Sequence, residues 1–171
     1  MCGITARVGE GPAIGELLSG LRNLEYRGYD SAGVATVTPD GINLVKYEGE
    51  IDVLCDAIDR SSVRGSTGIG HTRWSTHGPP TDANAHPHTD CLGRVAVVHN
   101  GIIDNYAELK TELSAHEFTS DTDTEVVPHL IEEFLSAGYG PEAAFRRTID
   151  RLSGSYAIAA VFEGSDPAVR S

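Results

Sequence analysis

The chain has 171 residues, of which 40% are hydrophobic and 22% are charged, and this composition predicts one soluble globular domain with a substantial core. It carries 13 Lys and Arg residues against 25 Asp and Glu residues, and the net charge of −12 argues against binding to nucleic acid or to an anionic membrane. We expect a cytoplasmic protein, because the sequence contains neither an apolar run of membrane-spanning length nor the charged and apolar regions of a signal peptide.

The first half of the chain alternates between strand patterns and helix patterns. Short apolar or β-branched runs bounded by Gly, Pro and Asp indicate strands, and apolar residues at helical spacing indicate helices. The first strand begins almost at the N-terminus, so we expect it to fix the first residues at the edge of a sheet. The predicted elements are a strand over 3–9, a helix from Pro12 to about Tyr26, a hairpin of 32–38 and 42–47, a helix over 51–60 and a strand over 67–74.

A long polar segment separates the two halves. Residues 74–92 are rich in Gly, Pro, Thr, Asp and His, and an irregular loop of this length is usually functional. The run VAVVH over 95–99 predicts a buried strand, which we expect to stop at Asn100-Gly101 because this pair is common in turns.

The rest of the chain predicts three helices and a final strand. Asp104 is placed to cap the first helix, the sequence from Thr122 to Glu125 matches a capping box, and Pro141 is suited to a first helical turn. The predicted elements are helices over 104–116, 126–135 and 141–152 and a strand over 155–162. Because the chain stops soon after this strand, we expect the domain over 1–171 to be incomplete at its C-terminus.

Cys2 directly follows the initiator methionine. Cysteine is small enough for Met1 to be removed, and this would leave Cys2 with both a thiol and a free α-amine. An α-amine titrates at about 7.7–8.0, so one residue could supply the nucleophile and its proton acceptor. Taken alone, this feature favours the simpler interpretation of Cys2 as an ordinary second residue. The three cysteines of the chain have no regular spacing, so we expect no disulfide framework.

Six motifs follow one another along the chain: Met-Cys-Gly-Ile at 1–4, Glu-Tyr-Arg-Gly-Tyr-Asp-Ser at 25–31, His-Thr-Arg-Trp-Ser-Thr-His-Gly at 71–78, Asn-Ala-His-Pro-His at 84–88, His-Asn-Gly-Ile-Ile at 99–103 and Ser-Asp-Thr-Asp-Thr-Glu at 120–125. In this order they resemble the class II glutamine amidotransferases, which are N-terminal-nucleophile hydrolases. The resemblance covers nearly the whole chain and is strongest to the glutaminase domains of the glutamine–fructose-6-phosphate aminotransferases. The glutaminase domains of amidophosphoribosyltransferases and asparagine synthetases are similar in fewer of these motifs.

The resemblance implies a fold, a reaction and partners. The fold would be α/β (α+β), a four-layer αββα sandwich, in agreement with two groups of short strands beside amphipathic helices. The reaction would be hydrolysis of the glutamine side-chain amide without a cofactor, and the ammonia would convert fructose 6-phosphate to glucosamine 6-phosphate. The implied partners are L-glutamine and sugar-isomerase domains outside this chain, with a homodimer as one expected assembly.

By resemblance, Cys2 attacks the amide while Asn100 and Gly101 form the oxyanion hole, and Arg27 orients the nucleophile or its amine. Removing one oxyanion donor typically costs about 2.7–4 kcal/mol of barrier height, so such donors matter. Without Cys2 and the other motifs, Asn100-Gly101 would be interpreted as a simple turn.

By resemblance, Arg73 and Asp123 bind the two charged groups of glutamine. Arginine can hold a carboxylate through two parallel N–H bonds, and Asp123 offers a negative charge to the α-ammonium group. The alternatives are a weak surface salt bridge for Arg73 and a helix-terminal charge for Asp123.

The same resemblance assigns the rest of the substrate site to the polar loop. Thr76, His77 and Gly78 would line the glutamine pocket, and His86 would support the loop. Trp74, the only tryptophan, would cover the bound substrate, whereas its simplest alternative role is core packing.

Two other functions compete with this one. The histidines and Cys91 could form a metal site, but their spacing matches no established ligand pattern, so we expect no metal. A second alternative is a module that binds glutamine or a partner without turnover. The side chains weighed as metal ligands are His71, His86, His88, Asp90, Cys91 and His99.

Overall fold

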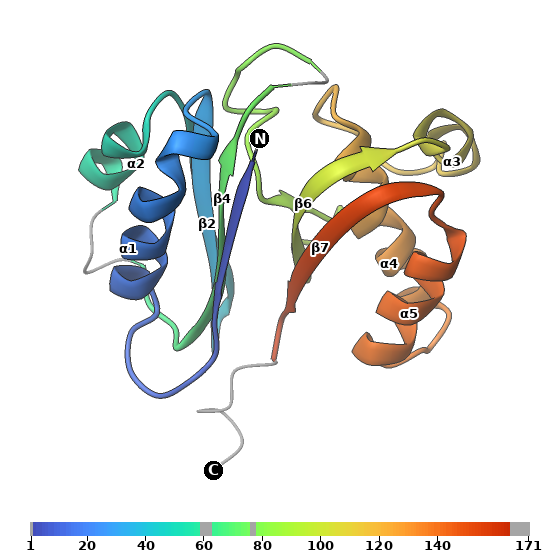
Figure 1. Cartoon of the computed structure of the whole chain (residues 1–171). Coiled ribbons are helices and arrows are strands. Elements are labelled where there is room, and N and C mark those ends of the chain that lie inside the picture. The colour runs from blue at the N-terminus through green and yellow to red at the C-terminus, as the bar shows by residue number, and fades with distance from the viewer. Residues whose placement is uncertain (1, 59–62, 76–77, 165–171) are drawn as a thin grey trace.

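Four layers make up the fold in the computed structural model, which describes residues 2–58, 63–75 and 78–164. Two sheets face each other, and helices cover the outer face of each sheet (Figure 1). Helices α1 (Ile14–Leu24) and α2 (Ile51–Ala57) lie on one side, and α4 (Val126–Ser136) and α5 (Pro141–Arg151) lie on the other. The predicted αββα arrangement is confirmed.

The first sheet has four antiparallel strands in the order β1-β4-β2-β3. The strands are β1 (Gly3–Arg7), β2 (Ser31–Thr38), β3 (Gly41–Glu48) and β4 (Thr67–Arg73). Strand β1 lies at the edge, where Gly3 pairs with Thr72. The N-terminal strand therefore fixes Cys2 next to the end of β4.

The second sheet has three antiparallel strands in the order β5-β6-β7. They are β5 (His88–Thr89), β6 (Val95–Ile103) and β7 (Gly154–Phe162). A 3₁₀ turn, η2 (Asp123–Glu125), leads directly into α4, and a short helix, α3 (Tyr106–Glu112), follows β6.

Three apolar clusters hold the four layers together, and they coincide with the three gaps between layers. Each fully buried aliphatic side chain contributes roughly 1.5–3 kcal/mol relative to exposure. The first cluster joins α1 and α2 to β2, the second joins β6 to α3, α4 and α5, and the third lies between the two sheets. The third cluster contains Ala35, Val37, Ile69, Ala96, Val98 and Val161.

Most of the predicted elements are present, with small differences at their ends. The hairpin, the first helix, the helix beginning at Pro141 and the strands near 3–9, 67–74 and 155–162 are confirmed. The helix predicted over 51–60 ends at Ala57, and residues 59–60 of that prediction lie outside the described residues. No helix in the described part of the chain is long and apolar enough to cross a bilayer.

Four local predictions are wrong. The loop over 74–92 contains the short strand β5, which pairs with β6. Strand β6 does not stop at Asn100 but continues to Ile103, because β7 pairs with it along its whole length and this ladder outweighs the turn preference of Asn-Gly. Helix α3 begins after Asn105 and not at Asp104, whose N–H donates to the Ser153 carbonyl.

The predicted capping box is the fourth error. Helix α4 begins at Val126 as expected, but Thr122 makes no side-chain cap bond. The Glu125 carboxylate instead accepts hydrogen bonds from Thr119 and Ser120, outside the box. Tertiary contacts have therefore replaced the local capping pattern.

Candidate active site

Cys2 lies at the N-terminal end of β1, beside the residue that follows β4. The Trp74 N–H donates to Cys2 Sγ at 3.2 Å, and the thiol is partly exposed. At the next residue, a Cβ on Gly3 would lie 2.7 Å from Leu24 Cβ and 2.9 Å from Thr72 Oγ1. The glycine thus permits the close packing that holds the Cys2 backbone against its neighbours.

Asn100 from β6 reaches Cys2 from the other sheet. Its Nδ2 donates to the Cys2 carbonyl at 3.2 Å, and its Oδ1 lies 2.9 Å from His71 Nε2. The same His71 nitrogen lies 3.0 Å from the His99 carbonyl, so it faces two acceptors and must carry the ring proton. His71 therefore orients the Asn100 amide with its N–H groups toward Cys2.

His71 is buried, and its environment keeps it neutral. Burial lowers the pKa of His71 to about 4, although hydrogen bonds to Asn100 and the His99 carbonyl oppose this shift. The sequence analysis considered His71 only as a possible metal ligand. Its role in positioning Asn100 depends on the contact between the two sheets, which no local pattern indicates.

Gly101 occupies a backbone position that other residues would not tolerate. Its φ is +127°, and a Cβ there would clash with the Ser155 carbonyl oxygen on β7. The position lies within the β6–β7 ladder, where Gly101 is opposite Tyr156. The glycine therefore allows β6 to continue past Asn100 while turning locally beside Cys2.

A cavity between the sheets brings together six of the residues selected from the sequence. Its volume is about 20 Å³, far below the about 300 Å³ of the smallest typical small-molecule sites, so this cavity is narrow. These lining residues are Cys2, Arg73, Trp74, His86, Gly101 and Asp123. Asn100 and Arg27 line two adjoining cavities that also include Cys2.

Arg73 and Asp123 are both buried at this cavity. Arg73 is 4% exposed, and its two terminal nitrogens donate to the Gly78 and Pro79 carbonyls at 3.3 Å each. Burial lowers the pKa of Arg73, while the negative potential of Cys2, Asp30 and Asp123 opposes that change. A surface salt bridge is therefore the wrong description of Arg73.

Asp123 begins the 3₁₀ turn η2 that precedes α4. It is 5% exposed, and its Oδ2 accepts a hydrogen bond from the Ile103 N–H at 2.9 Å. The carboxylate is thus fixed by the last residue of β6 while it faces the cavity. The two residues expected to bind charged groups come from different elements: Arg73 ends β4 of the first sheet, and Asp123 lies in η2 and is bonded to β6 of the second sheet.

Gly78 and His86 shape the loop around this cavity. Gly78 has a φ of +74°, and a Cβ there would lie 2.7 Å from Asn84 Nδ2. His86 Nε2 lies 2.9 Å from Thr124 Oγ1, and the His86 ring stacks on the His71 ring at 4.1 Å. These contacts agree with loop support by His86.

The remaining residues selected from the sequence differ in exposure, and two of them are not described by the structure. Trp74 is 44% exposed and contacts the Tyr29 ring edge-on at 5.4 Å between centroids, so core packing is excluded. Arg27 is partly exposed. Thr76 and His77 lie outside the described residues.

Two further residues of the loop environment were missed. Lys46 on β3 donates to the Ala83 and Ala85 carbonyls at 3.1 and 2.8 Å, and burial lowers its pKa to about 8. Asp30 accepts a hydrogen bond from the Ser75 N–H at 2.6 Å. Both fix the polar loop from the first sheet, and neither stands out in the sequence because their partners are backbone atoms.

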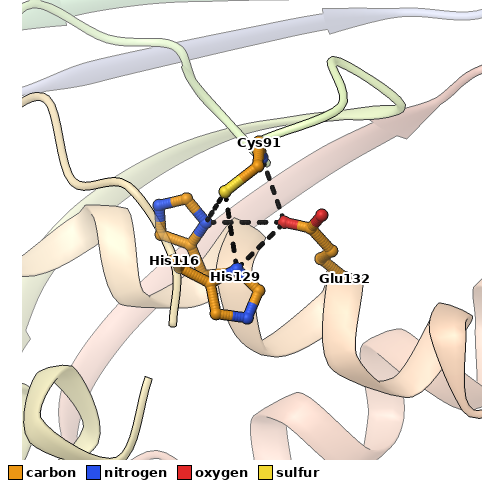
Figure 2. A group of neighbouring side chains, drawn as sticks. All are labelled: Cys91, His116, His129 and Glu132. Atoms are coloured by element: carbon orange, nitrogen blue, oxygen red, sulfur yellow. Dashed lines mark hydrogen bonds and ion pairs between the residues drawn. The ribbon is translucent and has the colours of Figure 1, made fainter. Parts of the chain in front are cut away.

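The metal cluster weighed from the sequence is not assembled in the described residues. The Asp90 carboxylate accepts hydrogen bonds from the backbone N–H groups of Arg94 and Val95, and His99 Nδ1 bonds to Thr124 Oγ1 at 2.8 Å. Cys91 instead lies with three side chains that the sequence analysis did not combine: His116, His129 and Glu132 (Figure 2).

Comparison with known proteins assigns the chain to a protein family. A family model described as a glutamine amidotransferase domain matches residues 71–169, which is more than half of the chain. The chain belongs to the glutamine amidotransferase family.

Curated relatives support this assignment along nearly the whole chain. Proteins named glutamine–fructose-6-phosphate aminotransferase (isomerizing) are 56% identical in Halobacterium salinarum, 51% in Sulfurisphaera tokodaii and 49% in Thermus thermophilus. These matches cover 96–99% of the chain but only 27–29% of each relative. This glutamine amidotransferase chain therefore spans less than a third of the relatives' length.

Solved structures of amidotransferases share the fold. The chain is similar to glutamine phosphoribosylpyrophosphate amidotransferase from B. subtilis, with a TM-score of 0.81 and 26% identity over 95% of the chain and 35% of that structure. A second structure, described as the allosteric regulatory enzyme of purine biosynthesis, gives a TM-score of 0.82 and 27% identity over 95% of the chain and 36% of that structure.

Proposed function

We propose that this chain hydrolyses the side-chain amide of glutamine with Cys2 as the nucleophile, as one glutaminase domain over residues 1–171. The observation that carries the proposal is one cavity lined by a thiol, a buried guanidinium group and a buried carboxylate. Glutamine presents the matching groups, namely an amide carbon, an α-carboxylate and an α-ammonium group. The family and the relatives' names support the same substrate.

Removal of Met1 would complete the nucleophile. The α-amine of Cys2 then accepts the thiol proton, and Cys2 Sγ forms a bond to the amide carbon of glutamine. The proton passes to the leaving nitrogen, ammonia departs, and a thioester remains. Water then attacks the thioester, which releases glutamate and restores the thiol. Arg27 would orient the nucleophile or its amine from the adjoining cavity.

The developing oxyanion needs donors that are already in place. In our proposal these are Nδ2 of Asn100 and the backbone N–H of Gly101. The His71 contact to Asn100 Oδ1 at 2.9 Å supports this role, since it prevents the amide from rotating. A donor held before the reaction stabilises the transition state more than one that must reorient.

Substrate selection would rest on residues from β4, from the loop that follows it and from η2. Arg73 binds the α-carboxylate of glutamine, and Asp123 binds the α-ammonium group. Trp74 covers the bound substrate, while Thr76, His77 and Gly78 complete the pocket. His86 supports the loop through Thr124.

Fructose 6-phosphate is the proposed acceptor of the ammonia. This proposal rests on the names of the relatives. The chains of these relatives extend well beyond the region that matches this protein. The proposed partners are therefore sugar-isomerase domains outside this chain, and a homodimer is the proposed assembly. The net charge of −12 favours a high-salt cytoplasm as its location, because salt screens the repulsion between carboxylates.

Ammonia release from glutamine by the purified chain tests the proposal. We expect activity in the wild-type protein and in Cys55→Ala, because Cys55 packs beside the core under α2. Cys2→Ala should release no ammonia. Glutamine binding by calorimetry without any ammonia release would contradict hydrolysis and would favour a binding module.

A further inference from the structure

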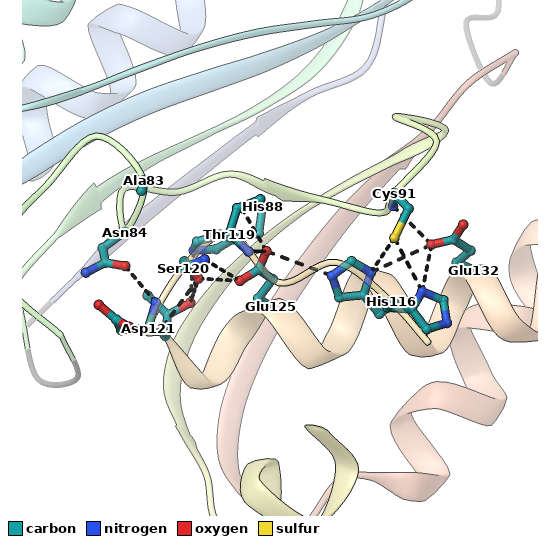
Figure 3. A network of polar contacts seen from close by, with 12 residues as sticks. Ala83, Asn84, His88, Cys91, His116, Thr119, Ser120, Asp121, Glu125 and Glu132 are labelled. Atoms are coloured by element: carbon teal, nitrogen blue, oxygen red, sulfur yellow. Dashed lines mark hydrogen bonds and ion pairs between the residues drawn. The ribbon is translucent and has the colours of Figure 1, made fainter. Parts of the chain in front are cut away.

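A compact group of four side chains lies along α4, beyond the hydrogen-bond network around Glu125 (Figure 3). Cys91 follows β5, His116 follows α3, and His129 and Glu132 lie one turn apart on α4 (Figure 2). One ligand atom from each residue lies within 4.8 Å of all the others. Three separate parts of the second half of the chain thus converge on one point.

The distances match those around a tetrahedral ion. Cys91 Sγ lies 3.5 Å from His116 Nδ1 and 3.6 Å from His129 Nδ1. With Zn–S of about 2.3 Å and Zn–N of about 2.0–2.1 Å, a tetrahedral ion separates sulfur from nitrogen by roughly 3.5–3.6 Å. Glu132 Oε2 lies 3.1 Å from His116 Nδ1 and 3.6 Å from His129 Nδ1, around the roughly 3.4 Å expected between nitrogen and oxygen ligands.

The surroundings orient the two rings for an ion. His116 turns Nδ1 toward the centre, and its Nε2 lies 2.8 Å from Glu133 Oε1. A carboxylate on the outer nitrogen is the usual partner of a metal-bound histidine, since it fixes the tautomer and the ring orientation. His129 likewise turns Nδ1 inward, and its Nε2 lies 3.8 Å from Glu125 Oε1.

The His129 ring is poorly satisfied by protein atoms alone. The side chain is 1% exposed, and its Nδ1 is 3.6 Å from both Cys91 Sγ and Glu132 Oε2. The contact to Glu132 is long for a buried ring nitrogen, and Nε2 of the same ring has no hydrogen-bond partner among the described residues, whereas an ion at the centre would lie at bonding distance from Nδ1.

We propose that Cys91, His116, His129 and Glu132 bind a structural Zn²⁺ ion. A thiolate, two imidazoles and one carboxylate are ligands that zinc accepts, and four protein ligands leave no open position for catalysis. The charges of the thiolate and the carboxylate balance the ion, so the group becomes neutral. The proposal departs from the sequence-based expectation of no metal.

Such an ion would tie two loops to α4. The same helix follows Asp123 and Glu125, and the group beside Cys91 lies next to the hydrogen-bond network around Glu125 (Figure 3). Zinc would therefore stabilise the helix that directly follows η2, the turn that forms one wall of the Cys2 cavity. Its contribution is to stability and not to the bond-breaking step.

The test measures zinc in the untagged full chain. Apo protein is incubated with equimolar Zn²⁺, passed through gel filtration and analysed by mass spectrometry for metal content. We expect about one zinc per chain in the wild-type protein, Cys2→Ala and the matched control Cys55→Ser, and less than a tenth of that in Cys91→Ser. Zinc lost with Cys2→Ala but kept in Cys91→Ser would overturn the proposal.

A second measurement does not depend on the folding of a variant. Wild-type apo protein is titrated with Co²⁺, and we expect the intense visible bands of a tetrahedral site with a thiolate-to-cobalt charge-transfer band, saturating at one equivalent and reversed by Zn²⁺. A spectrum of octahedral aqueous cobalt, together with an unfolding temperature unchanged by Zn²⁺, would refute the site.

Discussion

Replacing Glu125 by glutamine is expected to destabilise the segment that carries Asp123 into the Cys2 cavity. Glu125 is 2% exposed. Its Oε1 accepts hydrogen bonds from the Thr119 N–H and hydroxyl at 2.8 and 2.9 Å, and its Oε2 accepts from the Ser120 N–H and hydroxyl at 2.8 and 2.7 Å. Four donors therefore converge on one carboxylate.

The magnitude follows from the donors that glutamine cannot satisfy. In glutamine, one of the two carboxylate oxygens is replaced by an NH₂ group. The backbone N–H of Thr119 or Ser120 that bonded to this oxygen then faces another donor. The hydroxyl at the same position can rotate and accept a hydrogen bond from the NH₂ group instead. Losing a hydrogen bond to a charged group costs about 1.5–3 kcal/mol, and an unsatisfied buried donor adds to this. We expect Glu125→Gln to lower the free energy of unfolding by about 3 kcal/mol.

The effect should depend on pH with a defined sign. Burial raises the pKa of Glu125, but the nearby His129 ring and the hydrogen bonds from Thr119 and Ser120 outweigh it and hold the pKa well below its usual range. The carboxylate therefore stabilises the fold fully above the unfolded pKa of about 4.3, and this contribution decreases as the pH falls below that value. The difference between wild type and Glu125→Gln should shrink accordingly.

Urea unfolding followed by far-ultraviolet circular dichroism at pH 7 and pH 4 measures both effects. The matched control is Glu142→Gln, because Glu142 is 82% exposed in its pair with Arg146 and should change the stability by less than about 0.5 kcal/mol. If Glu125→Gln were as stable as this control at pH 7, our account of the carboxylate would be refuted.

Three further predictions concern the cavity itself. Arg73→Lys loses the planar fork, so KM for glutamine should rise roughly tenfold to a hundredfold with a smaller change in kcat; an unchanged KM would exclude a carboxylate ligand at this position. Gly101→Ala should lose at least about 2 kcal/mol of stability, since its Cβ clashes with the Ser155 carbonyl, whereas Gly15→Ala on α1 has nothing within 4 Å and should not lose stability. His71, with a pKa lowered to about 4, should make folding less favourable by about 3 kcal/mol as the pH falls from 6.5 to 4, and an NMR titration of its ring near pH 6.5 would contradict this.

Local pattern was sufficient for most helices and strands, whereas the four-layer arrangement and the cavity residues were expected from the family resemblance. The apolar period of α1, the Pro-Asp-Gly turn of the hairpin and Pro141 at the start of α5 each act within a few residues. The resemblance singled out Cys2, Arg73 and Asp123, and the structure brings all three to one cavity. The burial of Arg73 could be inferred from its position at the end of a strand predicted to be buried.

Long-range contacts explain what the sequence could not show. Asn100-Gly101 looks like a turn, but pairing with β7 extends β6 through it. Glu125 matches a capping box, yet its carboxylate bonds to the preceding loop. The group around Cys91 has no regular spacing because three separate segments contribute to it.

One local signal for that group was present in the sequence. His129 and Glu132 are three residues apart in a segment predicted to be helical, so they had to share a face. Their other partners, Cys91 and His116, become neighbours only after β5 pairs with β6 and α3 packs on α4.

Labelling with an electrophilic glutamine analogue tests the central claim most directly. The intact mass of the chain is measured before and after labelling, and the modified residue is mapped by peptide sequencing. We predict a chain without Met1 that carries a single adduct on Cys2 and is protected by excess glutamine. A retained Met1 together with label on Cys55 or Cys91, unaffected by glutamine, would contradict an N-terminal cysteine nucleophile.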